Sequence, residues 1–135
     1  MVPYQSRHSK LPGTSYKEVY KHAWKIFTQI RSQTKRQPYI KSAYFNKQKV
    51  FFTHFWIHLF QKPQRLRKNR LKFFQVAIDL ITNSHNQPIS KPNPNKKSET
   101  LHRFYGLTKN KELFIVQIKQ TANNRKLFMS CFQPE

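Results

Sequence analysis

Acidic residues are scarce in this 135-residue chain. Asp and Glu number five against 26 Lys and Arg, so the net charge is +21. The excess is not confined to a tail, because residues 1–37, 38–86 and 87–135 carry +7, +8 and +6. Such a chain opposes its own compaction by charge repulsion, and its charge favours a polyanionic partner. Nucleic acid is the first candidate, and an anionic membrane surface is the alternative.

Cysteine, glycine and long apolar runs are also rare. The single cysteine, Cys131, excludes an intramolecular disulfide and cannot alone build a cysteine-type zinc site. Two glycines, Gly13 and Gly106, leave no glycine-rich phosphate loop, so we expect no nucleotide cofactor. No stretch approaches about 18 uncharged apolar residues, and the N-terminus lacks a signal-peptide core. We therefore expect a soluble, cytoplasmic protein without a membrane partner.

Side chains that could bind a metal ion are also scarce. Hard cations need converging carboxylates, yet apart from Glu18 at the start of the first expected helix, only Asp79, Glu99 and Glu112 lie in or near expected folded elements. His54 and His58 have the i, i+4 spacing of zinc ligands, but no glutamate or third ligand accompanies them. We interpret them as polar edges of an aromatic helix and expect no metal site.

Periodicity predicts helices in the first two thirds of the chain. Apolar residues recur every three or four positions over 16–30, and Ser15 with Glu18 forms a capping box before them. Residues 50–60 are aromatic on most sides and predict a short buried helix, with a strand as the alternative. A third helix is expected over 65–84.

The last third has a different pattern. Residues 83–99 contain three prolines and almost nothing apolar, which predicts a long loop. Alternation then predicts strands over 101–108, 113–120 and 126–132 in an antiparallel meander. The expected fold class is α+β, with N-terminal helices packed on a small C-terminal antiparallel sheet. Residues 1–37 would form a basic segment with the amphipathic helix and 38–135 the remaining domain, together one globular unit.

Two groups of basic residues are candidate contacts for nucleic acid. Cations near a helix N-terminus oppose its dipole, and a bound phosphate removes that conflict. A solvated charged face is the alternative interpretation. The first group opens the expected third helix and the second lies in the expected loop: Arg65, Arg67, Lys68, Arg70 and Lys72, then Lys91, Lys96 and Lys97.

The strongest candidate for chemistry is the expected sheet. Its first strand carries His102, Arg103 and Tyr105, and the next strands add Gln117, Lys119 and Ser130. These residue types suffice to cleave RNA without metal, because a base can deprotonate the ribose 2′-hydroxyl while cations stabilise charge on phosphorus. Strand alternation places His102 on one face and Arg103 with Tyr105 on the other, so they can meet one substrate only at an edge, bulge or strand end. A histidine that is merely hydrogen bonded within the sheet is the alternative.

The C-terminal segments resemble a known group. LHRFYGLT (101–108), LFIVQIK (113–119) and KLFMSCF (126–132), preceded by PYIKSAYF (38–45) and SKPNPNK (90–96), are similar to small proteins of bacteria, their phages and mobile elements. That group resembles the barnase, EndoU, colicin and RelE superfamily of metal-independent ribonucleases. The resemblance implies His102 as general acid or base, Arg103 and Lys119 as phosphate stabilisers, and Ser130 or Tyr105 as a substrate contact.

The function expected from the sequence is a small metal-independent endoribonuclease, such as a toxin or defence effector. It would cleave RNA by internal transesterification, and an acidic antitoxin or immunity protein could accompany it. A non-catalytic RNA- or DNA-binding protein is the first alternative. A metal-dependent endonuclease is the second, because Gln117-Ile118-Lys119 resembles the (D/E)-x-K strand of restriction-endonuclease-like folds with Gln in place of the acid.

Overall fold

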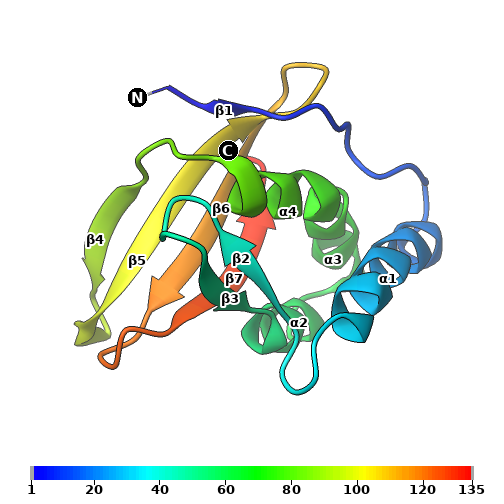
Figure 1. Cartoon of the computed structure of the whole chain (residues 1–135). Helices are drawn as coiled ribbons and strands as arrows, with labels where there is room; N and C mark the ends of the chain where they lie inside the picture. Colours follow the sequence, from blue (N-terminus) through cyan, green and yellow to red (C-terminus); the bar gives the residue numbers. More distant parts are fainter. Residues whose placement is uncertain (1, 135) are drawn as a thin grey trace.

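A curled sheet and a set of helices make up the computed structural model, which describes residues 2–134 (Figure 1). The strands, in the order β1-β5-β6-β7-β3-β2, form one mixed sheet, and β4 pairs with β5 beside β1. No helix in the described part of the chain is long and apolar enough to cross a membrane. In chain order the elements are β1 (Tyr4–Gln5), α1 (Tyr16–Ser32), β2 (Tyr39–Ser42), β3 (Gln48–Phe51), α2 (Thr53–Phe60), α3 (Gln64–Leu71), α4 (Phe74–Asn83), β4 (Ile89–Asn93), β5 (Lys96–Leu107), β6 (Leu113–Gln120) and β7 (Lys126–Phe132).

The expected α+β class is correct in mixing helices with a sheet, but the sheet differs from the expectation. The antiparallel meander of β5, β6 and β7 is confirmed. The sheet as a whole is mixed, because β1 pairs parallel with β5 and β3 pairs parallel with β7. Its strands are also spread through the chain instead of being confined to the C-terminus.

Three strands that precede the predicted meander, β2, β3 and β4, arise where the sequence pattern favoured a loop or a helix. β2 and β3 form a hairpin with a five-residue loop, in which Asn46 and Lys47 take left-handed φ values of 57° and 63°. β4 falls within the expected loop and pairs antiparallel with β5 despite Pro92. Proline is tolerated there because β4 is an edge strand whose outward side needs no ladder partner.

Helix α1 follows the sequence prediction closely. The backbone N–H of Glu18 donates to Ser15 Oγ (3.2 Å), and Ser15 N–H donates to Glu18 Oε1 (3.3 Å), which completes the capping box. Val19, Ala23 and Phe27 form its buried stripe. The segment before α1 is tied to the rest of the fold, because Leu11 N–H donates to the carbonyl of Lys72 (2.8 Å).

The helix predicted over 65–84 is two helices, and the one predicted over 50–60 begins later. Leu71 and Phe73 are both buried, yet on one continuous helix they would point about 200° apart. The chain therefore turns at Lys72 and Phe73, which separates α3 from α4. Residues 50 and 51 belong to β3, and α2 starts at Thr53.

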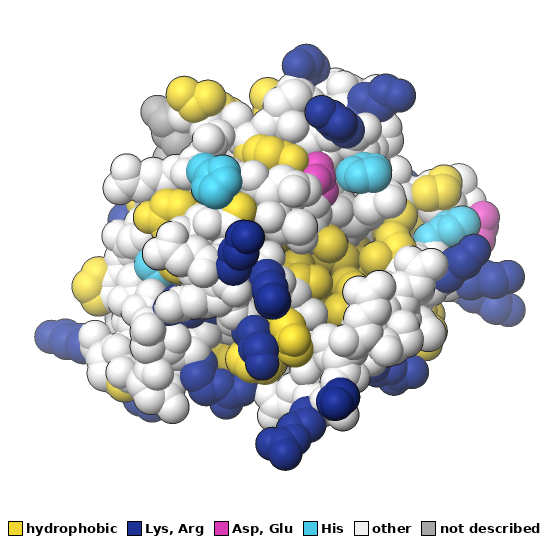
Figure 2. All heavy atoms as spheres, viewed as in Figure 1, with side chains coloured by type: hydrophobic (Ala, Val, Ile, Leu, Met, Phe, Trp, Pro, Cys, Tyr) yellow, Lys and Arg dark blue, Asp and Glu magenta, His cyan; other side chains and the backbone are white. Residues whose placement is uncertain are grey.

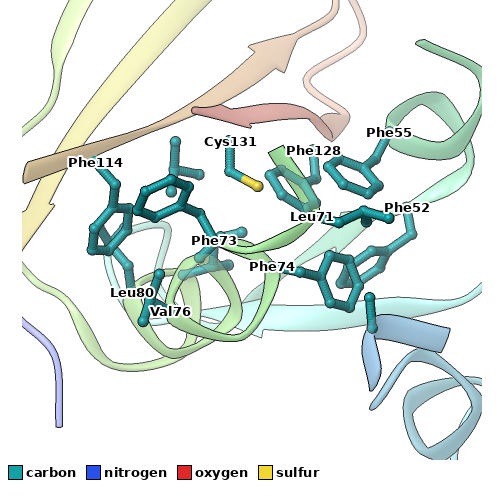
Figure 3. Close-up of a cluster of buried hydrophobic side chains, with 14 of the residues drawn as sticks. Phe52, Phe55, Leu71, Phe73, Phe74, Val76, Leu80, Phe114, Phe128 and Cys131 are labelled. Atoms are coloured by element: carbon teal, nitrogen blue, oxygen red, sulfur yellow. The ribbon is translucent and has the colours of Figure 1, made fainter. Parts of the chain in front are cut away.

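Aromatic side chains fill the core between the sheet and the helices (Figure 3). Phe55 of α2 stacks on Phe128 of β7 with ring centroids 4.6 Å apart. Cys131 is fully buried beside α3, where its thiol donates to the carbonyl of Arg70 (3.3 Å). Burial raises the pKa of this thiol, which makes Cys131 a packing residue.

On the β3 side, β7 is paired with a strand only over its first two residues. β3 contacts it only at Val50↔Lys126 and Phe51↔Leu127. Beyond these two pairs, helices α2 and α3 flank β7 in place of a strand, through the Phe55 and Arg70 contacts given above. The C-terminal half of β7 therefore borders helices along one edge and β6 along the other.

Gly106 provides a direct test of the packing between α4 and the sheet. A Cβ at this position would collide with the Phe114 ring and lie 2.9 Å from Leu80 Cδ1. We expect Gly106→Ala to lower the free energy of unfolding by about 1–3 kcal/mol through overpacking, measured by urea denaturation. The added change Phe114→Leu should recover part of the loss. A Gly106→Ala variant as stable as the wild type would contradict this packing.

Candidate nucleic-acid interface

The sheet divides the candidate residues between two faces, as alternation predicted. His102 and Gly106 lie on the inner face, where Gly106 approaches Leu80 of α4. The opposite face, here called the outer face, carries Arg103 and Tyr105 of β5. In the β5–β6 register Arg103 is opposite Gln117, and Lys119 follows two residues later on the same face of β6.

His102 is held inside a polar cluster on the inner face. Its Nε2 contacts Gln120 Oε1 (3.0 Å) and its Nδ1 contacts Ser90 Oγ (2.6 Å), so one ring nitrogen donates to the amide oxygen and the other accepts from the hydroxyl. Its ring packs against Phe45. Burial lowers the pKa of His102, although the Gln120 contact partly opposes this shift. The sheet therefore separates His102 from the outer-face cations.

A cleft opens on the outer face where β7 meets α2 and α3. Its volume is about 690 Å³. Among the residues that the structure describes, its lining contains no acidic side chain. We call it the Arg70–Arg103 cleft, and its lining residues are His58, Lys62, Leu66, Asn69, Arg70, Arg103, Gln117, Met129, Ser130, Phe132 and Gln133.

Two guanidinium groups share one aromatic ring in this cleft. Arg70 and Arg103 lie 5.2 and 5.6 Å from the centroid of Phe132. Arg70 donates to Ser130 Oγ, and Arg103 Nε donates to Gln117 Oε1 (3.2 Å). Each of these contacts uses one of five N–H donors on a guanidinium, so both groups keep donors for a ligand. Two like charges held near one ring, in a lining without acidic side chains among the described residues, make the cleft attractive to an anion.

His58 also lines this cleft, and it was not among the site residues predicted from the sequence. Burial, and then the positive charges of Lys119 and Lys62, lower its pKa below 6.5. A neutral imidazole at pH 7 can accept a proton, which suits a general base. The sequence analysis assigned His58 to a structural role, and its i, i+4 partner His54 does not line the cleft. His58 comes from α2, Arg70 from α3 and Arg103 from β5. The packing of both helices against β7 brings His58 into the same cleft as the two arginines.

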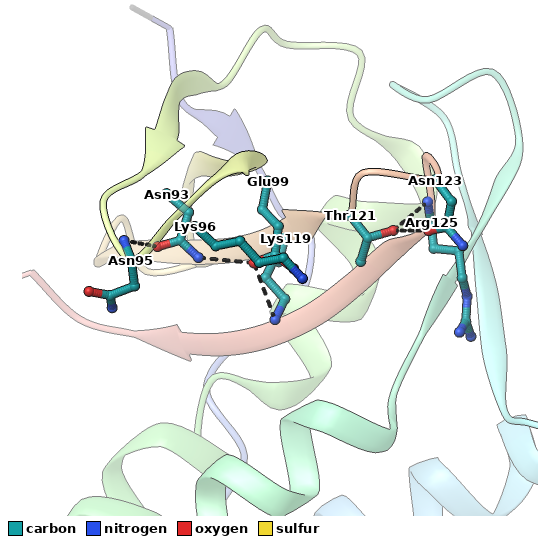
Figure 4. Close-up of polar contacts among 8 residues, drawn as sticks. All are labelled: Asn93, Asn95, Lys96, Glu99, Lys119, Thr121, Asn123 and Arg125. Carbon is teal, nitrogen blue, oxygen red and sulfur yellow. Dashed lines mark hydrogen bonds and ion pairs between the residues drawn. The ribbon is translucent and has the colours of Figure 1, made fainter.

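Lys119 and Tyr105 share the outer face but lie outside the cleft lining. The Lys119 ammonium lies 3.8 Å from Glu99 Oε1, and Asn93 donates to the same oxygen (3.0 Å) (Figure 4). This contact holds Lys119 close to the β4–β5 hairpin. Tyr105 is half-buried and stands opposite Ile115.

The basic residues predicted to bind phosphate have different environments. Arg67 donates to the carbonyls of Lys62 and Phe60 (both 2.6 Å), so it caps the C-terminal end of α2. Lys68 donates to the carbonyl of Thr14 (3.3 Å). Of the predicted α3 group, Arg70 alone lines the cleft. The others lie elsewhere on α3, after it at Lys72, or on the β4–β5 hairpin: Arg65, Arg67, Lys68, Lys72, Lys91, Lys96 and Lys97.

Basic side chains are not confined to the cleft. Figure 2 shows Lys and Arg both around the margin and near the middle of one face, with few acidic side chains. In the described part of the chain, no three His, Cys, Asp or Glu side chains cluster as metal ligands.

Comparison with family models, curated proteins and solved structures found no match to this chain.

The buried state of His102 predicts a pH-dependent stability. Burial disfavours the imidazolium in the folded chain, whereas the unfolded chain takes up the proton near pH 6.5. The contribution of His102 is therefore complete above about pH 6.5 and is lost as the pH falls below that value. We expect His102→Gln to flatten this fall in denaturation experiments at pH 5–8. His22→Gln, at an exposed site on α1, is the control; equal pH dependence in both variants would contradict the assignment.

Proposed function

We propose that this chain binds single-stranded RNA in the Arg70–Arg103 cleft and cleaves it there without a metal ion. The observation that carries the proposal is the composition of the cleft: two guanidinium groups, an imidazole and a hydroxyl, with no carboxylate among the described lining residues. Guanidinium groups bind the non-bridging oxygens of a phosphodiester and oppose the charge that accumulates on phosphorus. The outer face, and not the His102 side of the sheet, is the proposed reaction surface.

The proposed reaction is an internal transesterification. His58 accepts the proton of the ribose 2′-hydroxyl, and the 2′-oxygen forms a bond to phosphorus. The bond from phosphorus to the 5′-oxygen breaks, and that oxygen takes a proton from water. Arg70 and Arg103 donate to the non-bridging oxygens throughout. The products are a 2′,3′-cyclic phosphate and a 5′-hydroxyl end, and His58 returns its proton to solvent.

The proposal keeps part of the chemistry expected from the sequence. Arg103 remains a phosphate stabiliser and Ser130 a substrate contact, in agreement with the resemblance to metal-independent ribonucleases. His58 takes the proton-transfer role in place of His102, because it lines the same cleft as the cations. RNA is favoured over DNA because only ribose supplies the 2′-hydroxyl. The cytoplasm is where such an activity would meet RNA, and an acidic antitoxin or immunity protein would complement the basic cleft.

Cleavage of RNA in EDTA tests the catalytic part of the proposal. Wild-type protein should cut single-stranded RNA to cyclic-phosphate ends, and the rate should rise with pH and level off because the His58 pKa lies below 6.5. His58→Gln should slow single-turnover cleavage about 10²–10⁴-fold and leave RNA affinity nearly unchanged. His22→Gln is the matched control on exposed α1. RNA that is bound but never cut would favour the non-catalytic binding protein.

A salt titration tests the binding part separately. Affinity for single-stranded RNA should fall with a log-log slope of roughly −0.7 per phosphate contact. Arg103→Gln should reduce the magnitude of that slope by about 0.7, because the lost cation contacts phosphate. Arg65→Gln removes the same charge from an exposed α3 site outside the cleft and should change the slope less. Equal slopes for the two variants would exclude the cleft as the binding site.

A further inference from the structure

A second basic cleft lies at the opposite end of β7. It has a volume of about 800 Å³ and sits where the segment after α1 meets the β2–β3 hairpin and the β6–β7 turn. No acidic side chain lines it among the described residues. We call it the Arg125 cleft, and its lining residues are Gln33, Thr34, Lys35, Arg36, Gln37, Tyr39, Lys49, Phe51 and Arg125.

Its cations are placed over aromatic rings, as in the first cleft. Lys49 Nζ lies 4.6 Å from the Tyr39 centroid, and the Arg125 guanidinium lies 4.8 Å from the Phe51 centroid. Arg125 also donates to Gln37 Oε1 (3.0 Å). Figure 4 shows Arg125 projecting from the β6–β7 turn, away from Lys119 and its Glu99 partner. The cleft therefore presents oriented donors beside ring surfaces, an arrangement suited to single-stranded nucleic acid.

The two clefts open on the same face of the sheet. Phe51 pairs with Leu127, and Leu127 pairs with Lys119 of the outer face. Residues paired across neighbouring strands lie on one face, so the ring of Phe51 belongs to the outer face as well. The first cleft lies on this face through Arg103, which stands two positions before Tyr105 on β5.

Charged and titratable groups lie between the clefts. His54 lies on α2 one helical turn before His58, and the charges of Lys119 and Arg125 act on it, partly opposed by that of Glu99. Arg125 and Ser130 are five residues apart along β7, or roughly 16 Å at about 3.3 Å per residue. A stacked single strand covers that length in about five nucleotides at 3.4 Å each.

We infer that the Arg125 cleft is a second phosphate-binding subsite, and that one RNA strand crosses the outer face from it to the Arg70–Arg103 cleft. The inference rests on the proposed function, because it assigns a substrate length and path to the same binding face. The substrate is then a single-stranded segment of at least about five nucleotides. A nucleotide or dinucleotide occupies the first cleft alone.

Binding of short and long oligonucleotides distinguishes one subsite from two. The probes are 2′-O-methyl oligoribonucleotides of three and nine nucleotides, which lack a free 2′-hydroxyl and cannot be cleaved, and the readout is fluorescence anisotropy. Lys49→Gln/Arg125→Gln should weaken binding of the nine-nucleotide probe about tenfold and reduce its salt-slope magnitude by about 1.4. The affinity for the three-nucleotide probe should stay unchanged. Both residues are exposed, so the variant should fold.

Lys91→Gln/Lys97→Gln is the matched control, since it removes two charges from exposed sites on the β4–β5 hairpin. If the control weakens nine-nucleotide binding as much as the Arg125-cleft variant does, only general charge matters and the subsite is excluded. If the Arg125-cleft variant binds the longer probe like the wild type, the second subsite is also excluded while the proposed function stands. If wild-type protein binds neither probe, the proposed function fails together with the inference.

Discussion

The short contact between β3 and β7 determines where the Arg70–Arg103 cleft can form. β3 covers only the first two residues of β7, and α2 and α3 flank the remainder. Because helices and not a strand flank this edge of β7, long side chains from α2 and α3 can reach the outer face of the sheet. Arg70 extends from α3 to Ser130, and His58 faces the same space from α2. A longer β3 would occupy the edge through which these side chains enter the cleft.

The few acidic residues are all used within the fold in the described part of the chain. The Glu18 carboxylate accepts from Ser15 N–H at the start of α1, and Asp79 accepts from the Tyr4 hydroxyl (3.1 Å). Glu99 pairs with Lys119, and Glu112 pairs with Lys10 (2.9 Å). None of these carboxylates lines either basic cleft. The internal pairs stabilise loops and strand ends, and they leave the cations of both clefts without an acidic partner among the described lining residues. In the proposed function, this positive charge attracts the RNA polyanion to the outer face.

Local patterns predicted the parts of the fold whose causes are local. The capping box and apolar stripe gave α1, and alternation gave the three long strands together with the separation of His102 from Arg103. The β4 edge strand was missed because prolines mask strand pairing, and the break at Lys72 follows from tertiary burial of Phe73. The cleft could not be predicted, because its residues come from five elements. His102 was predicted as the general acid or base in the same strand as Arg103, although adjacent residues of a strand point to opposite faces of the sheet.

The most direct measurement is a structure of the chain bound to a nine-nucleotide 2′-O-methyl RNA. The account predicts a phosphate between the guanidinium groups of Arg70 and Arg103, with His58 beside the adjacent ribose O2′. It also predicts that the strand continues over the outer face toward Arg125. RNA bound on the β4–β5 hairpin or on the inner face, with no phosphate at Arg70 and Arg103, would contradict the account.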